Sequence, residues 1–180
     1  MTLTEKALRL AVTAHKEQVR KSDNSPYVVH PIMVSLILQE HGFDETIIAA
    51  AIAHDVLEDT AVTRQELASA LGEEVAAIVD GVSEDMSLGW EVRKEAYVHV
   101  VAAASEGVKA VSIADKIHNA ESIIHDYKTA GKTVWMPFTR GKTKKIWFEE
   151  LLYTEVQKTW NHPLLERYGS AIEKLKTLEE

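Results

Sequence analysis

The chain has 180 residues, of which 46% are hydrophobic and 27% are charged, with no cysteine and a formal net charge of −8. These values fit one soluble domain over residues 1–180, with a core large enough to be stable without disulfides. The lack of cysteine excludes disulfides and thiolate metal sites, and the acidity argues against a nucleic-acid polymer as partner. No apolar run can span a bilayer and the N-terminus is unlike a cleavable leader, so we expect a cytoplasmic protein without membrane contact.

Apolar residues recur at helical spacing along almost the whole chain, and the short strand-like runs are better explained as helix or loop. Residues that favour turns mark loops over residues 20–29, 83–90 and 131–141. The predicted helices span residues 3–19, 31–41, 47–59, 63–71, 73–82, 91–104, 107–128, 142–160 and 163–178. We therefore predict an all-α fold, formed as a single compact bundle of many helices.

Two of these helices have recognisable capping residues. Asp44 is placed to cap the helix that carries residues 47–59, because its carboxylate can accept a backbone N–H of the first turn. Thr63 followed by Glu66 matches the capping-box pattern and predicts the start of the next helix.

The pair His54–Asp55 stands in the segment AAAIAHDVLEDT, inside an otherwise apolar helix. Burying such a pair is costly unless the two side chains bind something, although an isolated His-Asp pair is more often a surface or capping pair. Glu58 and Asp59 follow four residues after His54 and Asp55, so the same two helix faces carry carboxylates one turn later.

Two further segments supply polar side chains of the same kind. Asp115 follows the apolar run VSIA and shares one helix face with Asn119 and Ser122, which indicates either a common ligand or a solvated polar stripe. His30 precedes Pro31 at a junction of loop and helix, where it either projects into a cleft or is an incidental cap.

Two histidines and two aspartates form a mixed nitrogen and oxygen set with room for water, which is typical of catalytic rather than closed structural metal sites. The donor types favour Mn, Fe, Zn, Mg or Co. A bound cation would lower the pKa of a water molecule and polarise a phosphoryl oxygen. Glu58 and Asp59 would then orient that water or accept its proton.

Four segments between about Ala14 and Ser122 resemble the HD-domain superfamily in the family's order. They are AHKEQVRKS with PYVVHP, AAAIAHDVLEDT, LGEEVAAIVDGVSED and SIADKIHNAES. More closely, the chain resembles the hydrolase domain of RelA/SpoT-type enzymes and the small stand-alone alarmone hydrolases. The resemblance implies an HD-domain bundle that removes the 3′-pyrophosphate of guanosine tetra- or pentaphosphate, giving GDP or GTP and pyrophosphate in the stringent response. Some stand-alone relatives also dephosphorylate NADPH.

The resemblance also implies roles for individual residues, carried over position by position. It implies Mn²⁺ as the cofactor, and the implied metal ligands are His30, His54, Asp55 and Asp115. Glu58 and Asp59 are implied to be catalytic, because they support the attacking water. The residues implied to bind a small phosphorylated guanine nucleotide are Arg20, Lys21, Ser22, Asn119 and Ser122.

The chain departs from the family pattern at several positions. The loop SDNSPY is one residue longer than a common form, so the assignments at Lys21 and Ser22 could shift by one. Ala120-Glu121 replaces a frequent Met-Arg pair, which removes a positive charge near the expected ligand. Trp147 or Phe148 stands where compact relatives carry a ligand-facing tyrosine.

Other polar residues have less support from the pattern. The lysines at positions 142, 144 and 145 either meet distal phosphates or form a solvated basic face. His118 lies beside the expected site but is predicted to point away from the face of Asp115 and Asn119. The remaining histidines are predicted to be surface or packing residues, namely His15, His41, His99, His125 and His162.

Three functions remain open from the sequence. The first is a metal-dependent alarmone 3′-pyrophosphohydrolase, which the complete set of ligands favours. The second is a phosphohydrolase of another nucleotide, such as NADPH or a deoxynucleotide, which the departures would explain. The third is a module that binds an alarmone without hydrolysis, against which Glu58 and Asp59 argue.

Overall fold

The computed structural model describes residues 1–20 and 24–180. Within them the chain forms helices, with one isolated bridge between Val19 and Pro26 and no longer strand. The elements are α1 Leu3–Ala14, α2 Val29–Glu40, α3 Glu45–Ala53, α4 Val56–Asp59, α5 Arg64–Leu71, α6 Glu73–Val82, α7 Trp90–Ala103, α8 Glu106–Ala130, the 3₁₀ helix η1 Gly131–Trp135, α9 Gly141–Val156 and α10 Pro163–Thr177. The prediction of an all-α fold is confirmed.

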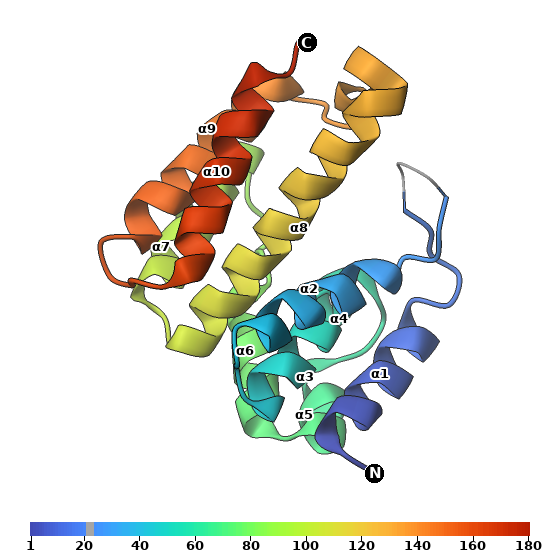
Figure 1. Cartoon of the computed structure of the whole chain (residues 1–180). Helices are drawn as coiled ribbons and strands as arrows, with labels where there is room; N and C mark the ends of the chain where they lie inside the picture. The colour runs from blue at the N-terminus through green and yellow to red at the C-terminus, as the bar shows by residue number, and fades with distance from the viewer. Residues whose placement is uncertain (21–23) are drawn as a thin grey trace.

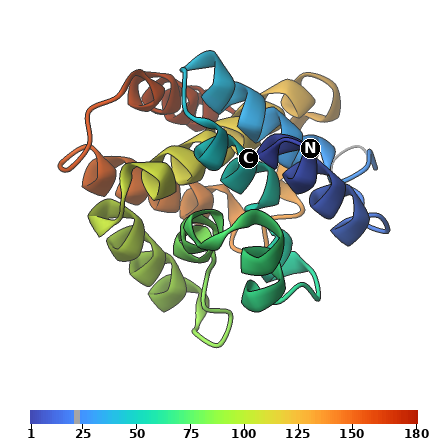
Figure 2. The ribbon, with the colours of Figure 1, turned by 90° about the horizontal axis from the view of Figure 1, so that it is seen from below.

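The long helix α8 lies between two sets of helices (Figure 1). On one side it packs against α2, α3 and α6, and α1 and α5 in turn pack against α3 and α6. On the other side α8 packs against α10 and α7, and α9 packs against both of these helices. The 3₁₀ helix η1 packs against α8, which it directly follows in the chain. The view from below shows the helices gathered around a common centre (Figure 2), so residues in the middle of α8 face both sets.

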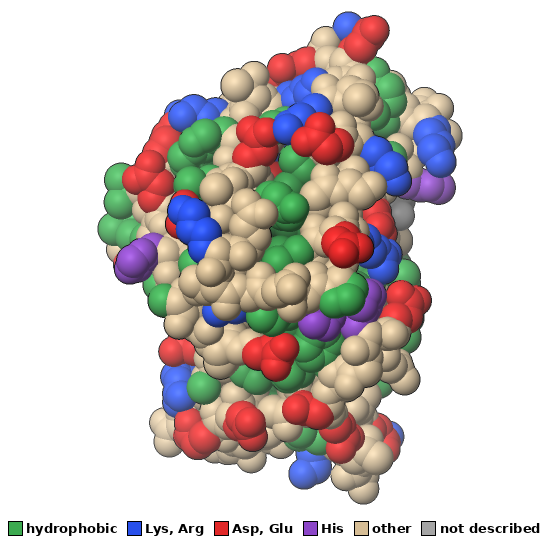
Figure 3. Space-filling model, turned by 60° about the vertical axis from the view of Figure 1, so that its left-hand side comes forward, with side chains coloured by type: hydrophobic (Ala, Val, Ile, Leu, Met, Phe, Trp, Pro, Cys, Tyr) green, Lys and Arg blue, Asp and Glu red, His purple; other side chains and the backbone are tan. Residues whose placement is uncertain are grey.

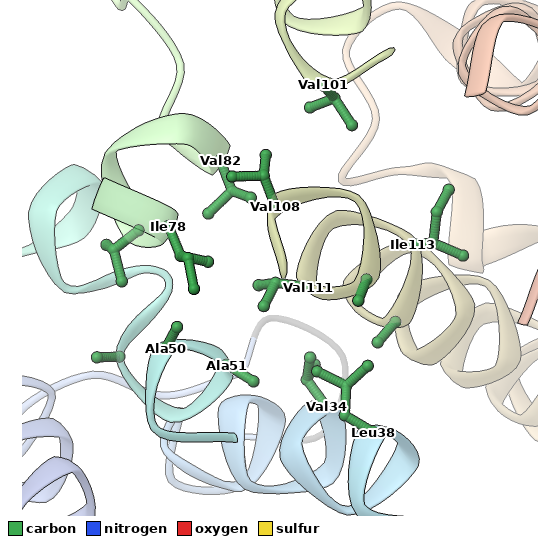
Figure 4. Close-up of a cluster of buried hydrophobic side chains, with 14 of the residues drawn as sticks. Val34, Leu38, Ala50, Ala51, Ile78, Val82, Val101, Val108, Val111 and Ile113 are labelled. Atoms are coloured by element: carbon green, nitrogen blue, oxygen red, sulfur yellow. The ribbon is translucent and has the colours of Figure 1, made fainter. Parts of the chain in front are cut away.

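The main core lies where α2, α3 and α6 meet the first half of α8 (Figure 4). Ala49, Ala50, Ala51 and Ala53 of α3 are fully buried, and their small side chains let the neighbouring helices approach closely. Gly81 shows how close α6 comes to α8, because a Cβ atom there would lie 2.8 Å from Val108 Cγ2. This packing fixes the position of α8 and therefore of Asp115, which lies among the buried residues of that helix.

Most helix boundaries agree with the prediction to within a few residues, but one interior position does not. The predicted continuous helix over residues 47–59 is wrong, because α3 ends at Ala53 and α4 begins at Val56. Asp55 adopts φ −92° and ψ −3°, a backbone conformation between the main allowed regions, so the helix is interrupted at the His54–Asp55 pair. The helices predicted over residues 3–19 and 142–160 also end early, at Ala14 and Val156.

None of the helices in the described ranges, residues 1–20 and 24–180, is long and apolar enough to cross a membrane. The longest, α8, has 25 residues, but charged and polar side chains interrupt its apolar positions.

The cap of α3 can be tested because this helix delivers His54 and Asp55 to their positions. Asp44 Oδ1 accepts the backbone N–H of Ile47 at 3.0 Å. We expect Asp44→Ala to lower the free energy of unfolding by about 1 kcal/mol, measured by urea denaturation followed by circular dichroism. Asp44→Asn is the matched control, because it keeps the acceptor oxygen and should lose less than half as much. Equal losses in the two variants would contradict the capping role.

Candidate metal centre and adjoining cleft

Four polar side chains from three regions of the chain meet at one point. His30 comes from the first turn of α2, His54 and Asp55 from the break between α3 and α4, and Asp115 from α8. His30 Nε2 lies 3.0 Å from Asp115 Oδ1 and 3.7 Å from Asp55 Oδ2. His54 Nε2 lies 3.1 Å from Asp55 Oδ2 and 3.8 Å from Asp115 Oδ1. The structure therefore brings together the four residues that the sequence proposes as metal ligands, and their role as ligands stays a prediction.

Three members of this group have the geometry expected of a metal site among the described residues. One ligand atom from each of His30, His54 and Asp115 lies within 4.8 Å of the other two, and all three residues are buried. Asp55 is only partly buried, and its Oδ2 lies near Nε2 of both histidines. Buried imidazole and carboxylate groups at this spacing suit a divalent cation with nitrogen and oxygen ligands.

The orientation of His54 fits a cation better than it fits an empty core. Its Nδ1 donates a hydrogen bond to the carbonyl of Ala51 at 2.7 Å, which leaves Nε2 as the atom facing the site. That Nε2 is buried and has no hydrogen-bond partner among the described residues. A buried polar atom without a partner is costly, and a cation at this point would remove the cost.

Electrostatics at the centre also favour positive charge. Burial disfavours the charged imidazolium, but the carboxylates of Asp55 and Asp115 outweigh it and raise the pKa of His54 to about 9. Burial alone would raise the pKa of Asp115, but the neighbouring cations Lys116, His30 and His54 hold it well below its usual range. The site therefore attracts cations, whether a proton or a metal ion.

His118 was predicted to point away from the face of Asp115 and Asn119, but it contacts the proposed site. Its Nδ1 lies 2.7 Å from Nδ1 of His30, so it contacts a proposed ligand directly. Burial, with the positive charges of His30 and Arg20, lowers the pKa of His118 to about 4, so it is neutral at pH 7 and can accept a hydrogen bond from His30. The signal was its position three residues after Asp115, one turn along the same helix.

Tyr27 is a second residue that the sequence did not single out. Its hydroxyl donates to Asp55 Oδ2 at 2.6 Å, and its ring packs edge-on against His30. Burial and the adjacent carboxylate of Asp55 raise the pKa of Tyr27, so the phenol keeps the proton that it donates. His15 packs against the other side of this ring, at 5.0 Å between centroids. Only its spacing of three residues from His30 could have indicated this role.

Glu58 and Asp59 lie beside the metal centre on α4. Glu58 Oε2 accepts the backbone N–H of Glu84 at 3.1 Å, and the carbonyl of Asp59 accepts Gln18 Nε2 at 2.7 Å. Both carboxylates reach solvent, yet partial desolvation and the charge of Asp55 raise the pKa of each. Carboxylates with raised pKa values accept protons more readily near neutral pH.

A cleft of about 880 Å³ opens beside the centre and is bounded by α7, α8, α9 and the segment around η1. The basic side chains that line it are Arg20, Lys94, Lys116, Arg140 and Lys145. Tyr27, Asp59, Lys116 and Asn119 line both this cleft and the smaller cavity of about 190 Å³ around the ligands, so the two are continuous. On the face shown in Figure 3, acidic and basic side chains are interspersed. An anion in the cleft would reach the metal centre.

Three of the five residues expected to bind a nucleotide line this cleft. They are Arg20, Asn119 and Ser122, whereas Lys21 and Ser22 lie outside the described residues. Asn119 Nδ2 donates to Asp115 Oδ1 at 2.5 Å, so it also orients a proposed ligand. Ser122 Oγ donates to the carbonyl of His118 at 2.8 Å.

Comparison with known proteins agrees with this arrangement. The family model described as HD domain matches residues 7–144. The chain belongs to this HD domain family. It is 38% identical over 119 residues to the Danio rerio guanosine-3′,5′-bis(diphosphate) 3′-pyrophosphohydrolase MESH1, covering 64% of this chain and 66% of that protein. It is 34% identical over 145 residues to the Aquifex aeolicus guanosine-3′,5′-bis(diphosphate) 3′-pyrophosphohydrolase, covering 79% of this chain but 19% of that protein.

Solved structures of similar proteins agree as well. One, described as a metazoan ortholog of SpoT that hydrolyses ppGpp, superimposes with a TM-score of 0.83 at 25% identity. The match covers 97% of this chain and 96% of that one. The protein lmo0812 from Listeria monocytogenes EGD-e superimposes with a TM-score of 0.74 at 30% identity, covering 80% of this chain and 96% of that one. The chain therefore has the HD-domain fold. It spans about a fifth or less of the length of most curated relatives that it matches.

The departures from the family pattern take specific places in this HD domain. Glu121, which replaces the arginine of the frequent pair, is not among the residues that line the cleft. Arg167 donates a hydrogen bond to each of its carboxylate oxygens at 2.8 Å. Phe148 lines the cleft, whereas Trp147 packs against Trp90 at 5.8 Å between ring centroids. Phe148 rather than Trp147 therefore gives the cleft its aromatic surface at this position.

The three lysines near the start of α9 make different contacts. Lys145 lines the cleft and pairs with the buried Glu149. Lys142 Nζ donates to the carbonyls of Lys176 and Leu178, and Lys144 pairs with Glu91. Of the three, only Lys145 can meet a phosphate in this cleft.

The raised pKa of His54 predicts how metal binding depends on pH. At pH 7 the metal-free imidazole carries a proton, which a cation must displace to bind Nε2. We expect the affinity for Mn²⁺ to rise by about tenfold per pH unit from pH 6 to 8 and about one proton to be released per ion. Titration calorimetry in buffers with different ionisation enthalpies measures both. His99→Gln, at an exposed position on α7, should leave the slope unchanged, and an affinity that is independent of pH would contradict the assignment.

Proposed function

We propose that the chain is a metal-dependent hydrolase that removes the 3′-pyrophosphate of guanosine tetra- or pentaphosphate. The observation that carries this proposal is the continuity between a cluster of His and Asp ligands and a cleft lined by basic residues. The printed names of the Danio rerio and Aquifex aeolicus relatives support the choice of substrate. A small guanine nucleotide as partner and a cytoplasmic location agree with this activity.

The proposed ligands of the metal are His30, His54, Asp55 and Asp115, and Mn²⁺ is the proposed ion. When bound, the cation supplies a Lewis acid for a phosphoryl oxygen and lowers the pKa of a coordinated water. Tyr27, His118 and Asn119 hold the ligand side chains in place through hydrogen bonds. Such partners of metal ligands typically change metal affinity by about 10–100-fold when they are removed.

Glu58 and Asp59 are the proposed proton acceptors. Both line the small cavity that holds the ligand side chains, and their raised pKa values suit the removal of a proton from the attacking water. The backbone N–H of Glu84 orients Glu58, and Gln18 holds the end of α4 through the carbonyl of Asp59. A module that only binds nucleotide has less need of these two acids.

The cleft accounts for recognition of a polyphosphate. Lys94 and Lys116 both lie within 6 Å of the centre of the Phe148 ring, where they present positive charge close to the metal centre. Arg20, Lys145 and Arg140 also line the cleft, where we propose that they bind the other phosphate groups of the nucleotide. Asn119 and Ser122 are proposed to contact the nucleoside, and Lys21 and Ser22 remain predictions.

A second candidate is hydrolysis of another phosphorylated nucleotide, such as NADPH or a deoxynucleotide. Phe148 favours it, because this side chain at the wall of the cleft has no hydroxyl for a hydrogen bond to the ligand.

The direct test is to incubate the protein with Mn²⁺ and guanosine tetraphosphate and to resolve GDP and pyrophosphate by ion-exchange chromatography. We expect turnover by the wild type and about a 100-fold lower kcat in Glu58→Gln, because a positioned acid or base contributes about 10²–10⁴-fold. Glu58→Gln should retain Mn²⁺ binding. Glu95→Gln, at an exposed position on α7, is the matched control and should behave as the wild type.

The same assay separates the alternatives. Turnover of NADPH or a deoxynucleotide with little turnover of guanosine tetraphosphate would favour the second candidate. Absence of turnover with any of these substrates across Mn²⁺, Mg²⁺, Zn²⁺, Co²⁺ and Fe²⁺ would contradict the proposal of a hydrolase.

A further inference from the structure

We infer that Glu84 is a positioning residue that joins the basic wall of the cleft to Glu58. It stands in the segment between α6 and α7, where no regular helix fixes the backbone. Its backbone and its side chain make contacts in two different directions, and each contact ends at a residue of the proposed active site. The inference rests on the proposed function, because it assigns a role within that reaction.

The first contact is made by the backbone. The N–H of Glu84 donates to Oε2 of Glu58 at 3.1 Å. Among the described residues, this is the hydrogen bond that the Glu58 carboxylate accepts. The other hydrogen bonds at α4 go to backbone carbonyls, from Gln18 to Asp59 and from Thr60 to Val56. The direction in which Glu58 points therefore depends on where this N–H is held.

The second contact is made by the side chain, which is 9% exposed and binds two cations. Glu84 Oε2 accepts Arg93 Nε at 2.9 Å, and Oε1 accepts the ammonium group of Lys94. Both cations come from the first turns of α7, and their side chains are 16% exposed. A partly buried carboxylate with both oxygens bound has little freedom to move, so these bonds hold the backbone of Glu84 in place.

The two cations have different positions relative to the cleft. Lys94 lines the cleft and lies 4.5 Å from the centre of the Phe148 ring, whereas Arg93 is not among the residues that line it. One carboxylate between two cations leaves a net charge of +1, and this charge is exposed to the cleft through Lys94. The group can thus attract a phosphate while Arg93 keeps Glu84 anchored.

These contacts form one path from the cleft to the proposed base. A phosphate at Lys94 meets a side chain that is bonded to Glu84, and the backbone of Glu84 is bonded to Glu58. The neighbouring Asp85 has the same charge but takes no part, because its carboxylate accepts the N–H and hydroxyl of Ser87 within the segment. The sequence alone does not distinguish these two adjacent acids.

The test compares Glu84→Gln with Asp85→Asn, two variants that each remove one negative charge from the same segment. We expect kcat for guanosine tetraphosphate to fall about tenfold in Glu84→Gln, a part of the ~10²–10⁴-fold that a positioned base contributes. Mn²⁺ affinity should stay within about twofold of the wild type, because the ligands are untouched. Asp85→Asn should leave kcat unchanged.

A double-mutant cycle separates positioning from a general effect on the fold. In a Glu58→Gln background, Glu84→Gln should cause no further fall in kcat, because the group that it positions is already gone. Amide exchange measured by NMR should be faster at residue 84 in Glu84→Gln than in the wild type. An equal fall in both backgrounds, an unchanged kcat, or unchanged exchange would overturn the inference.

A second variant covers the case in which Glu84→Gln does not fold, as judged by circular dichroism. Arg93→Gln removes the anchor outside the cleft and leaves the pair of Lys94 and Glu84, so we expect a smaller fall in kcat and faster exchange at residue 84. Wild-type values in that variant would overturn the inference. A wild-type protein without turnover would instead overturn the proposed function, so the two failures are distinguishable.

Discussion

The gathering of two aspartates and two buried histidines at one point is the constraint on which the rest of this structure depends. Asp55 and Asp115 approach the same pair of imidazole rings, and like charges so close together in a buried site are unfavourable. A cation between them removes the repulsion. Without it, the centre must hold a proton on His54, which is the origin of the raised pKa of that residue.

This constraint explains the local structure around the centre. The helix is interrupted at His54–Asp55, so that two adjacent residues reach one point instead of diverging by the 100° of a regular helix. Tyr27 and His118 hold a carboxylate and an imidazole from outside the ligand group. The apolar packing of α3 and α6 against α8 then fixes the distance between the two halves of the site.

Opposite charges are also paired in the cleft, where each of three lysines is held by a carboxylate. Lys116 pairs with Asp115, Lys94 with Glu84, and Lys145 with Glu149. Glu149 is fully buried and also accepts the hydroxyl of Tyr168. A chain with a net charge of −8 thus presents a basic wall to its ligand, because the compensating acids lie behind the lysines.

Much of the fold and the core of the site could be predicted from the sequence, because both depend on local patterns. Helical periodicity gave most helices, and the isolated polar residues within apolar runs pointed to His54 and Asp115. The break at Asp55, the contact of His118 with His30 and the turn of Glu121 toward Arg167 could not be predicted in this way. They depend on which helices become neighbours, and spacing along one helix does not contain that information.

The measurement that tests the central claim most directly is anomalous diffraction from crystals soaked with Mn²⁺, recorded at the manganese absorption edge. The account predicts one strong peak enclosed by the side chains of His30, His54, Asp55 and Asp115. A peak at another place, or no peak at a concentration of Mn²⁺ that supports turnover, would contradict it.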